Sequence, residues 1–428
     1  MSEEISGADS AKIAVVEKRY LIPFILLTSM FFAWGIANNM TDTLLAAFKK
    51  IMSMSDFETT FVQYAFYGAY FCFALPAAMF IRKYSYKTGI LIGLAMFIIG
   101  ALSFYPASQS MQYIHFLLAL YVLAGGLSFL ETSANPYIVA LGDPSTGTQR
   151  LNLAQSFNPI GSMTGILLSQ IFILSNLNSA DEDQRAQMGP EQLEAIQQAE
   201  LSAVMGPYVG VAIVLFILWI IIAKTKMPEA SDEAHNTKII PSFGRLLAKK
   251  NYRTALLALF CSVGAQICLW SFTIRYVMLE MNLNEADAAD YYLASLALFL
   301  ISRFICTWLM NYITPGRLMA YLCLTASALT LVVIFVGGTL GVYALVATSG
   351  CMALTFPTIY ALGLRGLGED TKIGGAGLIM MIIGGAVLTG IQGIISDNYG
   401  YHLSFFIPTI AFLVIANYGR LNVKAEIH

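Results

Sequence analysis

The sequence has little charge. Lysine, arginine, aspartate and glutamate make up 12% of its 428 residues, and the formal net charge is −2. A soluble domain usually carries about 25% charged residues, and a soluble chain of this length would divide into several domains. The shortage of charge argues against a soluble protein, and the lack of a basic excess argues against a nucleic-acid partner.

The sequence also lacks the patterns that hold metals or direct secretion. Its six cysteines all fall inside apolar runs and form no CxxC pair, and its four histidines are scattered. The cysteines are therefore expected to be small packing residues, and no metal or other cofactor is predicted. Residues 1–20 are polar and of mixed charge, unlike a secretory signal. No nucleophile–base pair is evident, so the chain is not expected to be an enzyme.

Apolar residues are abundant, at 57% of the chain. They gather in runs of about 20 residues between short polar connections, which is the length that a helix needs to cross a bilayer. The pattern predicts an all-α integral membrane protein with about twelve transmembrane helices. The predicted spans are 20–48, 59–82, 87–105, 112–141, 148–176, 205–224, 253–280, 287–311, 316–337, 340–365, 372–396 and 402–420.

Two longer polar segments organise the chain. Residues 175–205 are acidic, and residues 224–253 are basic and divide the spans into two sets of six, which is typical of a transporter built from two related bundles. Lysine and arginine favour one side of the membrane, which predicts that both termini are cytoplasmic. The predicted parts are a cytoplasmic N-terminal tail (1–19), an N-terminal six-helix bundle (20–224), a cytoplasmic linker (225–252), a C-terminal six-helix bundle (253–420) and a cytoplasmic C-terminal tail (421–428).

Span one carries polar side chains at membrane depth. Asp42 lies there, Asn38 precedes it by four residues on the same helical face, and Asn39 is adjacent. Gln63 adds an amide in span two. A charge at this depth is costly and usually faces a cavity or a partner, so this face is expected to line a cavity.

Span four repeats the arrangement. Glu131 lies deep in the apolar run and Asn135 follows four residues later, while Pro136 is expected to bend or break the helix. Span five adds Gln155 and Asn158, three residues apart along one face. The carboxyl groups inside spans therefore cluster in the first half of the chain.

The second half offers amides and aromatic rings. Gln266 and Trp270 share a face of span seven, and Tyr360 lies near Pro357 in span ten. Amides and carboxylates hydrogen-bond sugar hydroxyls, an aromatic ring stacks on a C–H face, and a desolvated carboxyl group can carry a proton. The combination predicts a proton-coupled carrier for a polyhydroxylated neutral solute.

Simpler interpretations exist for the individual residues. A single intramembrane amide often does no more than join two helices. Arg275 and Arg303 fit snorkelling or paired structural cations, and the glycine-rich runs fit close helix packing. Asp42 and Glu131 are harder to explain in structural terms alone.

Several stretches, in this order along the chain, carry a family resemblance. They are ANNMTDTLL (37–45), LETSANPY (130–137), RLNLAQSFN (150–158), GAQICLWSFTIRY (264–276), FPTIYALGL (356–364) and GEDTKIGGAGLIMMIIGG (368–385). The chain resembles the fucose–galactose–glucose/proton symporters, a branch of the major facilitator superfamily.

The resemblance implies two six-helix bundles that rock around a central site and import L-fucose or a closely related monosaccharide with a proton. It implies that Asp42 takes part in proton translocation and that Glu131 couples protonation to sugar binding. The predicted substrate-binding residues are Asn38, Asn39, Gln63, Glu131, Asn135, Gln155, Asn158, Gln266, Trp270 and Tyr360.

The expected partners are a monosaccharide, a proton and the lipid bilayer, without nucleic acid, and the expected form is a monomer in a bacterial inner membrane. Symport of glucose, galactose, mannose or N-acetylglucosamine with a proton or sodium stays open. A drug/proton antiporter would need a more apolar cavity, and a non-transporting sugar sensor would need a longer tail than RLNVKAEIH (420–428).

Overall fold

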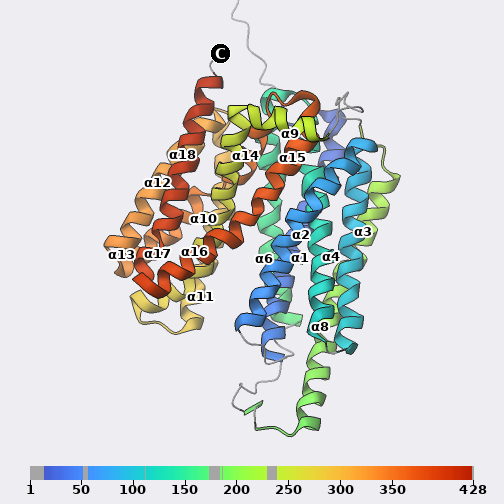
Figure 1. The fold of residues 1–428 in the computed structure, drawn as a ribbon, viewed down its shortest axis with the longest axis vertical. Helices are drawn as coiled ribbons and strands as arrows, with labels where there is room; N and C mark the ends of the chain where they lie inside the picture. The colour runs from blue at the N-terminus through green and yellow to red at the C-terminus, as the bar shows by residue number, and fades with distance from the viewer. Residues whose placement is uncertain are drawn as a thin grey trace, which may run out of the picture.

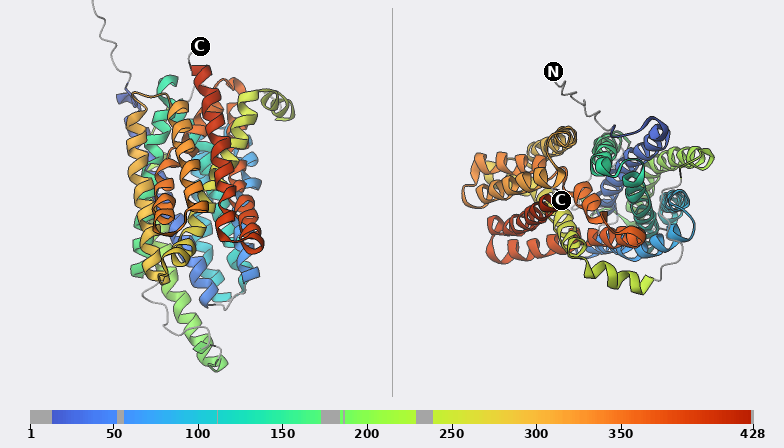
Figure 2. Two further views of the ribbon diagram at one scale, coloured as in Figure 1. Left: turned by 90° about the vertical axis from the view of Figure 1, so that its left-hand side faces the viewer. Right: turned by 90° about the horizontal axis from the view of Figure 1, so that it is seen from above.

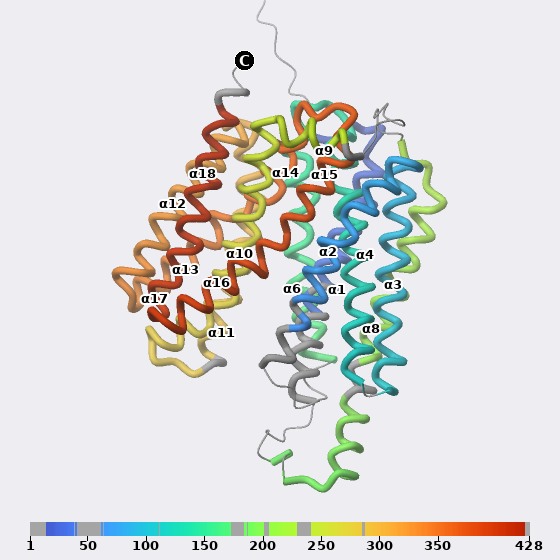
Figure 3. Tube along the Cα trace, viewed as in Figure 1, coloured from blue at the N-terminus to red at the C-terminus, as the bar shows by residue number. Residues whose placement is uncertain are grey.

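The computed structural model describes residues 14–51, 56–110, 112–172, 184–185, 187–228 and 239–426. The side chains at 38, 41–51, 56–60, 63, 201–204, 239–240, 285–286 and 424–426 are outside the description. Figure 3 draws the residues of uncertain placement in grey. Every regular element in the described residues is a helix, and the helices stand side by side in two groups (Figure 1; Figure 2).

The first group is built from the first half of the chain. The most extensive packing in this group joins α3 to α4, α1 to α6 and α2 to α4. Its helices are α1 (Leu21–Ile51), α2 (Asp56–Lys83), α3 (Tyr86–Ser110), α4 (Tyr113–Ala140), α5 (Gly147–Gln155), α6 (Phe157–Phe172) and α8 (Pro190–Lys224), with short 3-10 helices η1 (Lys18–Tyr20) and η2 (Pro144–Thr146).

The second group is built from the second half, with α10 packed against α16 and α18, and α12 against α13 and α18. Its helices are α9 (Ile239–Ala248), α10 (Lys250–Met281), α11 (Glu285–Leu309), α12 (Pro315–Phe335), α13 (Gly338–Cys351), α14 (Thr355–Leu364), α15 (Thr371–Met380), α16 (Gly384–Tyr399), α17 (Tyr401–Ser404) and α18 (Phe406–Glu426), with η4 (Gly368–Asp370) and η5 (Met381–Ile383).

Eleven helices of the described residues are long and apolar enough to cross a membrane. The predicted span 148–176 is not among them because Ser156 divides it into α5 and α6, of 9 and 16 residues. Pro159 lies just after the break and has no N–H to donate to the carbonyl of Gln155. At the break, the hydroxyl of Ser156 donates to the carbonyl of Asn152, at 2.8 Å.

Prolines act differently in two other spans. The span predicted at 340–365 is interrupted at 352–354, between α13 and α14, where Pro357 leaves the carbonyl of Ala353 without its helical partner. The break expected at Pro136 is wrong, because α4 continues through this residue to Ala140. Pro136 leaves one carbonyl, that of Thr132, without its helical donor, and the turns on either side keep the helix continuous.

Two polar segments are more helical than predicted. The helix α8 begins at Pro190 rather than near 205, because PEQLEAIQQAE supplies a proline at the first helical position and good helix formers after it. Figure 1 shows this part of α8 projecting beyond the other helices. The expected linker 225–252 contains α9, which Arg245 joins to Asp370 through hydrogen bonds of 2.5 and 2.9 Å.

The two groups touch near the end of the molecule at which α5 begins, called the closed end here. The helix α15 packs against α2 and α4 (Figure 1). Gln149 Nε2 donates to Thr307 O and Asn311 Oδ1, both at 3.0 Å, and Asn152 Nδ2 donates to Thr358 Oγ1 at 3.1 Å. Neutral polar groups therefore make these contacts of α5 with the second group.

Arg150 fixes the closed end of α4. Its side chain is 1% exposed. Nε donates to the carbonyl of Ile138 at 2.8 Å, Nη2 to that of Val139 at 2.6 Å, and Nη1 to the hydroxyl of Thr146 at 2.9 Å. The guanidinium thus pairs carbonyls at the C-terminus of the helix that carries Glu131.

We expect Arg150→Lys to lower the free energy of unfolding by about 2 kcal/mol, because one ammonium group cannot pair all of these buried acceptors. The thermal unfolding midpoint of the purified protein checks this. Arg317→Lys, at an exposed position near the start of α12, is the matched control and should leave the midpoint unchanged. Equal midpoints for both variants would contradict the role given to Arg150.

Candidate functional site

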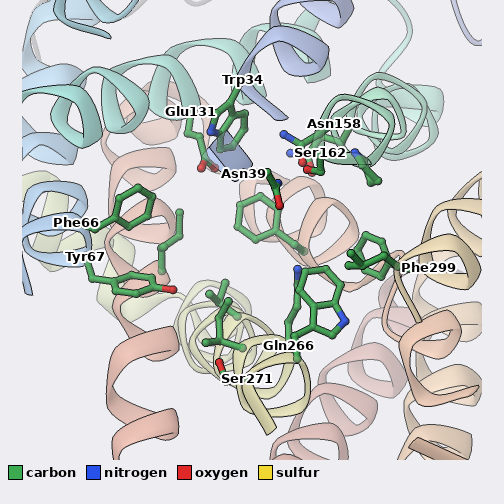
Figure 4. A pocket seen from close by; sticks show the side chains of 18 of the residues that line it. Trp34, Asn39, Phe66, Tyr67, Glu131, Asn158, Ser162, Gln266, Ser271 and Phe299 are labelled. Atoms are coloured by element: carbon green, nitrogen blue, oxygen red, sulfur yellow. The ribbon is translucent and has the colours of Figure 1, made fainter. Parts of the chain in front are cut away.

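A cavity of about 640 Å³ lies between the two groups of helices (Figure 4). This volume is within the range of roughly 300–1,000 Å³ that small-molecule sites occupy. The residues that line it are Trp34, Asn39, Val62, Phe66, Tyr67, Tyr70, Glu131, Gln155, Asn158, Pro159, Ser162, Met163, Val263, Gln266, Ile267, Trp270, Ser271, Tyr292, Leu296, Phe299, Arg303, Phe356 and Ile382. Both groups therefore contribute to one site.

Glu131 is the acidic residue of this wall. Among the described residues that line the cavity, it is the one carboxylate, and its side chain is 3% exposed. Tyr70 of α2 lies close to it in the same cavity, and Asn135 Nδ2 donates to its Oε2 at 3.4 Å. Gln155 Nε2 donates in turn to Asn135 Oδ1 at 2.9 Å. A chain of polar side chains thus links the carboxyl group to the break between α5 and α6.

Two amides line the cavity from α1 and α6, which pack closely together. Asn158 Nδ2 donates to the carbonyl of Phe31 at 3.3 Å, and Asn39 Nδ2 to that of Gly35 at 3.4 Å. A Cβ at Gly35 would lie 2.1 Å from the carbonyl oxygen of Asn158, so only glycine permits this approach. Trp34 also lines the cavity, and its Nε1 is buried without a hydrogen-bond partner among the described atoms.

The second group supplies an aromatic wall. The rings of Trp270 and Phe299 lie 5.1 Å apart with an interplanar angle of 74°, and Trp270 Nε1 donates to Ser349 Oγ at 3.4 Å. The guanidinium of Arg303 lies 4.5 Å from the centroid of Phe299. Figure 4 shows Gln266 facing the cavity across from Glu131 and Asn39. Amides, an indole and a carboxyl group therefore converge on one space.

The structure brings together six of the predicted substrate-binding residues. They are Asn39, Glu131, Gln155, Asn158, Gln266 and Trp270. Asn135 and Tyr360 are both 0% exposed and do not line the cavity: Asn135 lies behind Glu131, and Tyr360 stacks behind Phe356. The side chains of Asn38, Asp42 and Gln63 lie outside the described part of the structure, so their roles stay predictions.

Sequence reasoning missed several residues of the wall. Trp34 precedes Asn38 by one helical turn, and Phe299 precedes Arg303 by one turn, so the i, i+4 spacing used for Gln266 and Trp270 could have found both pairs. The same spacing could not have found Tyr70, because α2 has few polar residues around it. Arg303 lines the cavity and is 6% exposed, so it is not a snorkelling cation.

Two groups of membrane-spanning helices around one central, partly polar cavity define a multi-pass membrane transporter. A model of the Major Facilitator Superfamily matches residues 24–382. The chain belongs to this superfamily, which confirms the family resemblance and the predicted fold.

Curated relatives match the chain along most of its length. The L-fucose-proton symporter of Haemophilus influenzae is 40% identical over 417 residues, covering 95% of this chain and 97% of the relative. That of Escherichia coli is 38% identical over 411 residues, covering 95% and 94%. A glucose/galactose transporter of Brucella abortus is 32% identical over 413 residues, covering 96% of each. The relatives are transporters, and this chain is not an enzyme.

Solved structures agree with this assignment. The transporter FucP in its outward conformation has a TM-score of 0.89 and 38% identity, covering 94% of this chain and 99% of that one. The proton:xylose symporter XylE has a TM-score of 0.69 at 11% identity, covering 92% and 93%. The second likeness shows the fold alone.

Proposed function

We propose that the protein is a proton-coupled symporter that imports L-fucose or a closely related monosaccharide by alternating access. The observation that carries this proposal is the cavity of about 640 Å³ in which Glu131 shares a wall with amides and faces an indole. The relatives named as L-fucose-proton symporters support the same substrate and coupling ion.

The chemistry of the wall suits a neutral sugar. Asn39, Asn158 and Gln266 offer amides for hydroxyl groups, and Trp270 offers a ring face of the kind on which a C–H face of a sugar stacks. The wall thus combines directional polar groups with an apolar plate, as small-molecule sites do. The density of amides disfavours a drug/proton antiporter.

The proposed cycle begins with the cavity open to the outside. A proton binds at Asp42 and Glu131, which removes the cost of enclosing charge at membrane depth. Sugar then fills the cavity, and the two groups rock to open the closed end. The proton leaves on the cytoplasmic side, where the pH is higher, and the empty carrier returns.

The arrangement in the membrane belongs to the same proposal. The groups correspond to bundles at 20–224 and 253–420, joined by a cytoplasmic linker at 225–252 and flanked by cytoplasmic tails. The protein is proposed to be a monomer in a bacterial inner membrane, without a nucleic-acid partner. The described ends of the chain lie at the same end of the molecule (Figure 2), which supports a common side for both termini.

The first test is the external pH of a weakly buffered, de-energised suspension of cells that express the protein. We expect transient alkalinisation when L-fucose is added, because each sugar enters with a proton. Alkalinisation with glucose, galactose, mannose or N-acetylglucosamine instead would keep the mechanism and change the sugar. No pH response from well-inserted protein would contradict proton symport, and sugar uptake that requires sodium would then identify sodium as the coupling ion.

A further inference from the structure

Arg303 makes hydrogen bonds that neither a snorkelling nor an ion-paired arginine would need. Its Nε donates to the carbonyl of Ala353 at 2.6 Å, and its Nη1 donates to that of Gln155 at 3.0 Å. Among the residues that the structure describes, no carboxylate lies within ion-pair distance of its guanidinium. The buried cation is therefore paired by backbone carbonyls.

Both carbonyls belong to turns that a proline has opened. In an α-helix, the carbonyl of one residue accepts from the N–H four residues later. Pro159 stands four residues after Gln155 and Pro357 four residues after Ala353, and proline has no N–H. Each carbonyl therefore lacks its helical donor, and the guanidinium of Arg303 supplies one in its place.

The two opened turns lie in different groups of helices. Gln155 ends α5 in the first group, and Ala353 lies between α13 and α14 in the second. Arg303 itself is on α11, where Thr307 and Asn311 also contact α5 through Gln149. Arg303, Thr307 and Asn311 thus follow one another at intervals of four residues along α11 and just past its end, and each contacts α5. Of the three, Arg303 lines the cavity.

We propose that Arg303 is a positioning residue that pins the two groups together at the closed end, by pairing one proline-freed carbonyl from each. The groups cannot separate there without breaking the bond to Gln155. The side chain of Gln155 continues the connection through Asn135 to Glu131, with hydrogen bonds of 2.9 and 3.4 Å. Gln155, which Arg303 holds through its carbonyl, is therefore also connected through Asn135 to the carboxyl group of Glu131.

The inference rests on the proposed alternating access, but its test needs neither sugar nor a proton gradient. Thr148 is 2% exposed, and its hydroxyl lies 3.4 Å from Nη2 of Arg365, at the end of α14. A Thr148→Cys substitution therefore reports opening of the closed end. The rate of its alkylation by N-ethylmaleimide is measured on purified full-length protein in lipid nanodiscs, against a parent that carries only the native cysteines.

In this background Arg303→Lys is expected to speed alkylation at position 148 about tenfold or more, because a hydrogen bond from a charged donor is worth roughly ten- to a hundredfold in an equilibrium constant. One lysine nitrogen cannot occupy the Nε and Nη1 positions together. Arg275→Lys is the matched control, since Arg275 lies over the ring of Tyr401 at 5.4 Å within the second group. It should leave the rate unchanged.

Pro159→Ala tests the same bond without touching Arg303. The alanine N–H would pair the carbonyl of Gln155 within its own helix and compete with the guanidinium. We expect faster alkylation in this variant also, and no further increase when it is combined with Arg303→Lys, because both changes remove one interaction.

Three outcomes would overturn the proposal: an unchanged rate in folded Arg303→Lys, an equal increase in Arg275→Lys, or additive effects of Arg303→Lys and Pro159→Ala. The thermal unfolding midpoint identifies folded variants. If Arg303→Lys does not fold, an unchanged rate in Pro159→Ala overturns the proposal by itself. Failure of L-fucose to elicit a pH change would contradict the transport proposal and leave these alkylation rates as they are.

Discussion

Glu131→Gln is expected to abolish proton-driven accumulation of L-fucose while leaving exchange of the sugar measurable. Glutamine keeps the size of the side chain and can still hydrogen-bond Tyr70 and Asn135, but it cannot release a proton. One pH unit corresponds to about 1.4 kcal/mol, so one-to-one coupling supports about tenfold accumulation across such a gradient. In the variant, the ratio of internal to external sugar concentration should reach one, as measured with labelled sugar in membrane vesicles.

Glu280→Gln is the matched control for this prediction. Glu280 accepts a hydrogen bond from the backbone N–H of Gly338 and lies 2.9 Å from His402 Nε2, away from the cavity. It should keep the accumulation ratio. If Glu131→Gln accumulated sugar to the level of the unmodified protein, Glu131 would have no role in proton coupling. Asp42→Asn, made in parallel, tests the other predicted carboxyl group. Sugar exchange distinguishes loss of coupling from loss of folding.

Gly35→Ala should disrupt both folding and sugar binding. The added Cβ would lie 2.1 Å from the carbonyl oxygen of Asn158 and 2.8 Å from the backbone nitrogen of Ser162. Because backbone atoms cannot rotate away, α1 and α6 must move apart, at a cost of about 3 kcal/mol. The same shift moves the amide of Asn158 away from its position in the wall of the cavity. The thermal unfolding midpoint and the affinity for L-fucose are both expected to fall.

Gly68→Ala provides the comparison on α2. A Cβ at Gly68 would meet nothing within 4 Å, and alanine is favoured over glycine inside a helix by about 1 kcal/mol. This variant should therefore be as stable as the unmodified protein or more so, with unchanged sugar affinity. If Gly35→Ala behaved in the same way, the close approach of α1 and α6 would not be what positions Asn158.

The fold could be predicted from the sequence where membrane thickness sets helix length. Apolar runs located the spans, but their internal breaks depend on tertiary context: Pro136 is accommodated within α4, whereas Pro159 and Pro357 follow breaks whose carbonyls Arg303 pairs. No local pattern distinguishes these cases. The helical start of α8 was missed because its polar residues were interpreted as a loop, although Pro190 marks a helix N-terminus.

The site could be predicted in part for a similar reason. Amides and carboxyl groups in apolar runs are conspicuous, so Asn39, Glu131 and Gln155 were found. Whether a buried polar side chain reaches the cavity or stands one layer behind it depends on helix rotation, which the sequence does not specify for a helix that is apolar on every side. Asn135 and Tyr360 therefore fall behind the wall.

The contacts that Gln149 and Asn152 make at the closed end have a consequence for ionic conditions. Their partners are amide, hydroxyl and carbonyl groups that carry no net charge. Dissolved salt screens exposed charges over a Debye length of about 8 Å at physiological ionic strength, but it has little to screen between neutral dipoles in contact. A rise in salt concentration on the side of the membrane that the closed end faces would therefore change the strength of these contacts little.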